Sequence, residues 1–359
     1  MAKHRYSEIL ADESITTAGT KTIDVNLTDP ISAIFGQVRL TNNGSTPTGH
    51  PVAALPKIEV VDGSDVICSL TGRQAQAKQF FDQGKPPLNI LAYLNDVQCI
   101  ASFVILFGRY PWDEEMGLDP TRFNNLQIKI QHNYALGGSS PDAATLQVYG
   151  MLFDSMPPSL KGFIQSKEIY SYSLTSGAYE YVELPRDYPL RRLILQSLAA
   201  DKAMNDQLNE VKLSEDHDKK IIIEEAVSNL IKFGLGPDMQ YNEEIFGSSA
   251  MGGVDHYVTP VHEVHGVFNA MDSGVAIAKE ETPGNLFKII SASATPNVRG
   301  LIRGYCPHGC FPVNFGDPSY PPDAWDVTGL KSARLRIKGG SSVGSASTAQ
   351  VVAEQYRMY

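Results

Sequence analysis

The sequence predicts an all-β protein made of two β domains built to one plan, and three observations lead to this prediction. Polar and apolar residues alternate with period 2, as in strands with one wet face, in TIDVNL (22–27), GQVRLT (36–41), LQIKIQ (126–131) and ARLRIK (333–338). The 30 glycines and 22 prolines gather in turn-like clusters between such segments, which favours sandwiches or barrels over alternating β and α elements. Finally, one order of elements occurs twice.

The repeated order is a strand, a polar turn, a second strand and a helix. The first copy begins with KIEVVDGSDVICSL (57–70), and its helix is GRQAQAKQFFDQG (72–84). The second begins with NEVKLSEDHDKKIIIEEA (209–226), and its helix is EEAVSNLIKFG (224–234), which ends on a glycine as the first does. The copies start at residues 57 and 209, 152 residues apart, with negligible identity. Duplication of a domain explains this order, with chance as the alternative, and the boundary is expected near FDSMPPSLKG (153–162).

Composition narrows the class of protein. The 359 residues carry a net charge of -10, which argues against a dedicated nucleic-acid binder because such a protein needs a basic face. The longest apolar run, CIASFVILF (99–107), is too short to span a bilayer and fits a buried strand. No apolar run follows the first basic residues, so we expect no secretory signal. Four cysteines do not make a disulfide framework, and we expect reduced thiols in a protein made in the cytosol.

The stretch YCPHGC (305–310) looks most like a metal site. Zinc sites usually take two close pairs of cysteine or histidine ligands. Cys306, His308 and Cys310 offer one pair at most, and the nearby candidates, His262 and His265, are three residues apart, so on a strand they face opposite sides. Pro307 and Gly309 suit a tight turn between two strands, which is the interpretation we favour, with the cysteines as small packing residues and no metal bound.

Two acidic segments could serve acid–base chemistry. PWDEEMGLDP (111–120) places Asp113, Glu114, Glu115 and Asp119 around Trp112, and LSEDHDKK (213–220) adds Glu215, Asp216, His217 and Asp218. Both lie between strands, where charge usually keeps a loop in water. No nucleophile elbow, phosphate-binding loop or dinucleotide motif occurs, so we predict neither catalytic residues nor a cofactor.

Several segments spread over the chain resemble the major capsid proteins of tailless, icosahedral, membrane-containing bacteriophages, in the double jelly-roll lineage that includes adenovirus hexon. The segments that carry this resemblance are 57–82, 107–150, 187–200, DHYVTP (255–260), GYCPHG (304–309) and GGSSVGSASTAQVV (339–352).

The resemblance implies two tandem eight-stranded jelly rolls with a few short helices in inserted loops. It implies a pseudo-hexagonal homotrimer that tiles an icosahedral shell over an internal membrane, in a virion whose proteins are made in the host cytoplasm. Partners would be neighbouring trimers, penton and minor capsid proteins and the lipid surface, with no sequence-specific nucleic acid. Residues 1–14 would form an arm in which Lys3, His4 and Arg5 could face acidic lipid headgroups. The jelly rolls would span 15–157 and 158–338, and 339–359 would be a tail packed on neighbouring elements.

Two other classes of protein stay open at this point. One is a glycan-acting hydrolase of the amidase kind on two β-sandwiches, with Trp112 and Trp325 stacking on sugars beside the acidic loops. The other is a receptor-binding or spike protein of a virion. Segments 41–51, 108–123 and 235–253 are candidates for the outer surface or for lateral contacts, and the sequence does not sort them.

Overall fold

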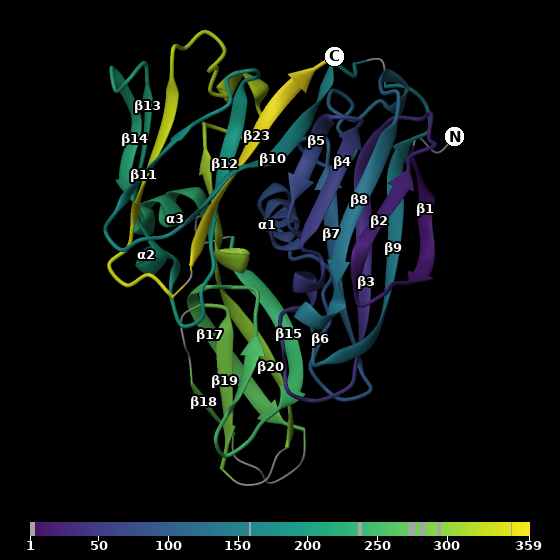
Figure 1. Cartoon of the computed structure of the whole chain (residues 1–359), viewed down its shortest axis with the longest axis vertical. Coiled ribbons are helices and arrows are strands. Elements are labelled where there is room, and N and C mark those ends of the chain that lie inside the picture. Colours follow the sequence, from purple (N-terminus) through teal and green to yellow (C-terminus); the bar gives the residue numbers. More distant parts are fainter. Residues whose placement is uncertain are drawn as a thin grey trace.

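The structure, a computed structural model, describes residues 4–157, 159–235, 239–271, 277–280, 284–292, 296–345 and 347–359. Most of these residues lie in strands, arranged as two sandwiches side by side and a smaller lobe at one end (Figure 1). Within the described ranges, none of the helices has the length and apolarity needed to cross a bilayer.

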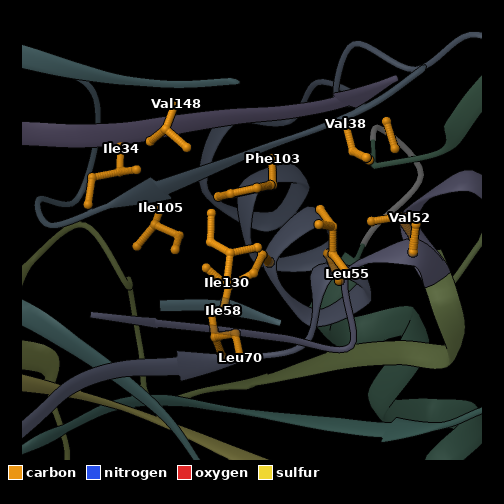
Figure 2. Packing of buried hydrophobic residues seen from close by; sticks show 14 of the residues in the cluster. Ile34, Val38, Val52, Leu55, Ile58, Leu70, Phe103, Ile105, Ile130 and Val148 are labelled. Carbon is orange, nitrogen blue, oxygen red and sulfur yellow. The ribbon is translucent and has the colours of Figure 1, made fainter. Parts of the chain in front are cut away.

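The first sandwich is an eight-stranded jelly roll. One sheet has the order β1-β9-β3-β7, and the facing strands have the order β2-β8-β4-β5. Its strands are β1 (His4–Ser14), β2 (Ala18–Asp24), β3 (Ile31–Asn42), β4 (Lys57–Asp62), β5 (Asp65–Leu70), β7 (Gln98–Leu106), β8 (Leu126–Asn133) and β9 (Pro141–Phe153). Helix α1 (Gly72–Gln83) and the short β6 (Leu91–Ala92) lie between β5 and β7, and 3-10 turns cover Pro51–Ala54, Pro120–Arg122 and Tyr134–Leu136. Inward-facing side chains from both sheets form its core (Figure 2).

The second sandwich repeats this plan with eight more strands. The order β10-β23-β12-β21 faces the sheet β11-β22-β13-β14. The strands are β10 (Gly162–Ser173), β11 (Tyr179–Glu183), β12 (Leu190–Ser197), β13 (Leu208–Glu215), β14 (Lys220–Ala226), β21 (Cys310–Asn314), β22 (Ala333–Gly339) and β23 (Thr348–Met358). Its helices are α2 (Met204–Gln207) and α3 (Val227–Leu235), with 3-10 turns at Pro307–Gly309 and Pro321–Asp323. The predicted fold class, two tandem eight-stranded jelly rolls, is therefore confirmed.

The two jelly rolls share one sheet. Strand β5 of the first pairs in parallel with β10 of the second, where Cys68 lies opposite Ser166 and Ser69 opposite Lys167. This pairing joins four strands from each jelly roll into one eight-stranded sheet. The two sandwiches are therefore connected by backbone hydrogen bonds as well as by side chains.

Matching irregularities show that the two jelly rolls repeat in detail. The pairing register shifts between Glu8 and Leu10 on β1, and between Glu168 and Tyr170 on β10. It shifts between Ile31 and Ala33 on β3 and between Leu190 and Arg192 on β12, in each case just after a proline. The β4–β5 and β13–β14 hairpins share a third shift, at Val60/Val61 and Leu213/Ser214. Because a bulge fixes which residues oppose each other, these three shifts align the two halves residue by residue.

The sequence did not predict the lobe. It contains β15 (Tyr241–Ser248), β16 (Val254–Tyr257), β17 (His262–Ala270), β18 (Ile277–Glu280), β19 (Leu286–Ser291) and β20 (Asn297–Tyr305). Together with β6 of the first jelly roll, three of these strands form one sheet of order β17-β20-β15-β6, and the others form a second sheet of order β16-β19-β18. The lobe is inserted between α3 and β21, the place where the first jelly roll has only β6. Both ends of the described chain lie in the half of the molecule away from it (Figure 1).

The chain ends differ from the expected arm and tail. Residues 4–14 of the expected arm form β1, which pairs along β9 from His4 opposite Phe153 to Ser14 opposite Thr145. Residues 348–358 of the expected tail form β23, which lies in the middle of the shared sheet between β10 and β12. Strand β1 is an edge strand, mostly exposed, so its sequence lacks a strong apolar pattern.

Candidate functional site

The joint between the two jelly rolls holds a cluster of five buried charged side chains. Helix α1 provides Lys78 and Asp82, β12 provides Arg191 and Arg192, and β23 provides Glu354. Lys78 Nζ lies 2.7 Å from Asp82 Oδ2 and 3.3 Å from Glu354 Oε1. Arg191 Nη1 lies 2.9 Å from Asp82 Oδ1 and 2.8 Å from Glu354 Oε2. All five side chains are at most 3% exposed, so this cluster connects the helix of one jelly roll to the sheet of the other in the absence of solvent.

The cations of the cluster keep its carboxylates ionised. Burial by itself would raise the pKa of Asp82, but Arg192, Lys78 and Arg191 together lower it below its ordinary value. The pKa of Glu354 is likewise lowered, with burial opposing the same three cations. Burial tends to lower the pKa of Arg191, and the two carboxylates raise it. The cluster thus carries three positive and two negative charges at neutral pH.

Helix α1 begins at a capping box and contacts the second jelly roll along one face. The Thr71 hydroxyl accepts a hydrogen bond from Gln74 N, and the Gln74 side chain accepts one from Thr71 N. Gln74 Nε2 also donates to Glu168 Oε2 on β10, at 2.8 Å. Four residues further on, Lys78 reaches Glu354.

The YCPHGC stretch forms the predicted tight turn between β20 and β21. Cys306, His308 and Gly309 have φ values of 54°, 54° and 68°, in the left-handed region. Both thiols are buried, and the ring of His308 is fully enclosed, with Nε2 2.8 Å from Gln76 Oε1 of α1. Because a glutamine oxygen only accepts, His308 Nε2 donates this hydrogen bond. The turn therefore attaches the end of the lobe to the helix at the joint.

A chain of hydrogen bonds continues from the joint into the lobe. His50 Nδ1 accepts from Val52 N, which leaves Nε2 to donate to Thr259 Oγ1 at 3.0 Å. Thr259 Oγ1 then donates to Glu243 Oε2 at 2.6 Å. Burial, with a smaller effect of Arg73, lowers the pKa of His50 to about 3. Burial raises the pKa of Glu243 to about 7, partly offset by the hydrogen bonds from Thr259.

The histidines at 262 and 265 do not form a metal site with the YCPHGC turn. His262 lies opposite Tyr305 and His265 opposite Arg303 in the β17–β20 ladder, which shifts register between them. In the described part of the chain, no group of three or more histidine, cysteine or acidic side chains is placed to hold a metal ion.

The acidic loops use their carboxylates in structural contacts. Asp113 is fully buried and receives two hydrogen bonds from the Arg109 guanidinium, from Nε at 2.6 Å and from Nη2 at 2.7 Å, and a third from Arg109 N at 3.1 Å. Glu115 lies between Arg109 and Lys161, 2.7 and 2.8 Å away. Asp119 caps a 3-10 turn by accepting from Thr121 N. This leaves no pair of open carboxylates in the loop for glycan hydrolysis, which needs an acid and a base facing one substrate.

The two tryptophans are also engaged within the chain. Trp325 is 8% exposed and donates from Nε1 to Glu215 Oε1 at 2.8 Å. Trp112 packs on the ring of His4, with centroids 4.2 Å apart, and on Phe153. The predicted stacking surface for sugars is therefore not formed by these residues.

Of the three basic residues predicted to face a membrane, Lys3 lies outside the described residues. His4 packs against the rings of Trp112 and Phe153. The Arg5 guanidinium forms ion pairs with Asp29 and, at 3.6 Å, with Asp154. The positive charge of Arg5 is therefore already balanced on its own surface.

The thiols provide a direct test of the turn. All four cysteines are buried and unpaired. Burial raises the pKa of Cys68 to about 12 and that of Cys99 to about 11, and it also raises the pKa values of Cys306 and Cys310 well above their ordinary value. Because the thiolate is the reacting form, we expect the native protein to show almost no reaction with a thiol reagent at about pH 8. All four thiols should react after unfolding, and rapid native labelling of two thiols would contradict a buried turn.

Comparison with known proteins identifies the fold. No protein-family model matches the sequence, and no curated protein matches it. The STIV major capsid protein, from Sulfolobus turreted icosahedral virus, matches over 99% of this chain and 97% of its own, with a TM-score of 0.60 and 12% identity. The major capsid protein of bacteriophage PM2 matches over 99% and 98%, with a TM-score of 0.58 and 8% identity. The PBCV-1 protein VP54 matches over 99% and 93%, with a TM-score of 0.59 and 10% identity.

These matches cover both jelly rolls and the lobe, because each spans nearly the whole chain. At such low identity they establish the fold and leave the function to be argued from the residues. The chain has the double jelly-roll fold of viral major capsid proteins.

Proposed function

We propose that this chain is a viral major capsid protein, and that it assembles as a homotrimer that tiles an icosahedral shell. The observation that carries the proposal is the duplicated jelly roll, matched over nearly its full length by two major capsid proteins. Two similar domains in each of three chains give six similar corners, which suit a hexagonal footprint. The role is structural and non-catalytic. This agrees with the carboxylates of the 111–120 loop, which form ion pairs and cap a 3-10 turn.

The fold suits tiling for physical reasons. Each jelly roll closes its sheets against each other, and the shared sheet makes the pair one stiff block. The buried ion cluster and the YCPHGC turn add rigid contacts between the two jelly rolls and the lobe. Weak contacts between many copies can then add up around a shell.

The two ends of the molecule differ, since one carries the lobe and the opposite half holds both described chain ends, and this difference supports an orientation in the shell. We propose that the lobe faces outward and that the opposite half, which holds both described chain ends, faces an internal membrane. Lys3, His4 and Arg5 would lie on that side, although the aspartates beside Arg5 reduce its attraction for acidic lipid. Penton and minor capsid proteins would be further partners. Lipid extracted from purified particles would support the membrane, and particles free of lipid would contradict it.

The oligomeric state is the first test of the proposed function. We expect light scattering coupled to gel filtration to give three times the chain mass of 39.2 kDa. Negative-stain images should show three-fold particles with a near-hexagonal outline. A monodisperse monomer at high concentration would contradict the proposal, and so would a copy number per virion as low as that of a spike.

A further inference from the structure

The two surfaces that meet in the joint between the jelly rolls each have an equivalent elsewhere in the chain. Among the residues that the structure describes, these two equivalent surfaces do not contact each other. In the internal joint, α1 of the first jelly roll covers the outer face of β12, β23 and β21 of the second. Ile194, Val352 and Cys310 on that face belong to the same apolar cluster as Ala75 and Ala77 of α1. The ionic contacts of Lys78 with Glu354 and of Asp82 with Arg192 lie beside this apolar contact.

The shared bulges identify the counterpart of each of these residues. The shift in the hairpins places Cys68 of β5 at the same position as Ile223 of β14 and sets α1 and α3 in the same register. Gln74 then corresponds to Asn229, and Lys78 corresponds to Phe233. On the sheets, Arg192 corresponds to Ala33, Glu354 to Met151 and Ile194 to Phe35, as the ladders on either side of each bulge show.

The counterpart of Lys78 is an exposed aromatic side chain. Phe233 is 75% exposed, the largest exposed fraction among the large apolar side chains of the described residues. A groove of about 510 Å3 lies beside it, lined by residues that include Ile222, Leu230 and Pro312. Phe233, on the face of α3 that corresponds to the joint face of α1, thus has no cover within the described part of its own chain.

The counterpart of the covered sheet face is also apolar and open. On the outer side of the β1-β9-β3-β7 sheet, Ala33, Val104 and Leu106 form a small apolar cluster with Phe35 and Met151. Phe35 and Met151 are only half-buried, although their counterparts Ile194 and Glu354 are fully enclosed. This face corresponds to the surface that α1 covers in the second jelly roll.

We propose that α3 of one copy docks on the outer face of β3, β9 and β7 of a second copy, repeating between chains the joint that α1 forms within one chain. This inference rests on the proposed function, because it names the contact by which the copies join. The residue types agree with the match. In the internal joint, Lys78 lies opposite Glu354, so both facing residues are charged. In the proposed contact between chains, Phe233 would lie opposite Met151, so both facing residues are apolar.

A polar pair at the edge of the joint has a counterpart as well. Within the chain, Gln74 Nε2 donates to Glu168 on β10. The first bulge places Glu8 of β1 at the position of Glu168, because Tyr149 and Val352 lie opposite them. Asn229 of α3 would then donate to Glu8 of the partner subunit. Both are present at the surface, and Glu8 is exposed.

Such a contact is head-to-tail, because it joins two different surfaces of the same chain. Interfaces of this kind form closed rings when the rotation closes and open filaments when it does not. A ring in which internal and external joints alternate has two joints for each copy, and three copies give the six-cornered particle of the proposed function.

The test transfers the internal ion pair to the proposed interface. We expect Phe233→Lys alone, and Met151→Glu alone, to shift the mass from three times 39.2 kDa to that of one chain. The double variant should recover the trimer, because the introduced ammonium and carboxylate would pair between chains as those of Lys78 and Glu354 do within one chain. Phe233→Leu should keep the trimer, and circular dichroism with thermal melting checks that each variant is folded.

A cross-linking experiment on the full-length chain keeps the inference testable if a charged variant fails to fold. The native thiols are buried, so cysteines introduced by Phe233→Cys and Met151→Cys are the ones that a short bismaleimide reaches. We expect covalent dimers and trimers on a denaturing gel. Phe233→Cys with Met251→Cys, whose methionine is 72% exposed on the lobe, should give none.

The outcomes separate this inference from the proposed function. A trimer that survives Phe233→Lys and shows no link between positions 233 and 151 would overturn the interface and leave the capsid role intact. A chain that stays monomeric at every concentration would overturn both. Loss of the trimer in each single variant with recovery in the double variant would establish the contact.

Discussion

Replacing Glu354 with glutamine is expected to reduce the free energy of unfolding by about 3–5 kcal/mol, the usual cost of breaking a buried ion pair from one side. Glu354 is fully buried and lies within 3.3 Å of Lys78, Arg191 and Arg192. Without its charge, three cations face Asp82 alone. For a chain of this length the melting temperature should fall by about 4–7 °C, measured by calorimetry at fixed protein concentration.

A control variant on the lobe removes the same charge from an exposed ion pair. It therefore separates the effect of burial from the effect of losing a charge. Glu244→Gln breaks the ion pair of Glu244 with Arg299, in which both side chains are about half exposed. Exposed pairs contribute about 0–1 kcal/mol, so this variant should melt within about 1 °C of the wild type. Equal losses in the two variants would show that the cluster at the joint has no special role.

The pH dependence of stability should change with the same substitution. Because the pKa values of Asp82 and Glu354 are lowered in the folded chain, their stabilisation is present above their unfolded pKa values, about 4–4.5. It is lost as the pH falls below that range. Buried, neutral His50 and His308 add a loss that begins below about pH 6.5, and this part is common to both proteins. The difference between wild type and Glu354→Gln should therefore shrink only below about pH 4.5.

The sequence predicts those parts of the fold in which local pattern and environment agree. The strand–turn–strand–helix order recurs because it forms the same hairpin and helix in each jelly roll, and the structure shows the shared bulge behind it. Pro307 and Gly309 indicate the turn at 305–310 because few residues tolerate its backbone.

The joint could not be predicted from the sequence, because its residues look like surface residues. Lys78, Asp82 and Glu354 are charged, and charged side chains are rarely buried unless a partner from elsewhere in the chain neutralises them. The partners of Lys78 include a residue 276 positions away, at Glu354. The sequence predicts a tail in place of β23 for the same reason, since its buried Glu354 and Gln355 and its half-buried Gln350 face polar partners. The repeated order of elements does not predict the lobe, because its sheets fill an insertion that has no equivalent of similar size in the first jelly roll.

Replacing Gly309 with alanine is the second substitution for which we expect a large effect. Gly309 has φ 68°, and a Cβ built there would lie 2.1 Å from the carbonyl oxygen of Ser197 on β12. The left-handed backbone alone costs about 1–2 kcal/mol for alanine. The overlap with a backbone atom of a buried strand requires β12 or the turn to move, and overpacking of this kind adds about 1–3 kcal/mol.

The turn cannot move freely, because its neighbours hold it from three sides. His308 N donates to Thr259 O of the lobe, His308 Nε2 donates to Gln76 of α1, and His308 O accepts from Gln196 Nε2 of β12. A shift that accommodates the new methyl group would weaken contacts to both jelly rolls and the lobe together. Gly63→Ala provides the control, since Gly63 has φ 60° with open space around its Cβ position. Denaturant unfolding should show a loss of only about 1–2 kcal/mol for Gly63→Ala and about 2–5 kcal/mol for Gly309→Ala. Equal losses would mean that backbone strain alone governs the turn, and that the packing of β12 against it contributes little.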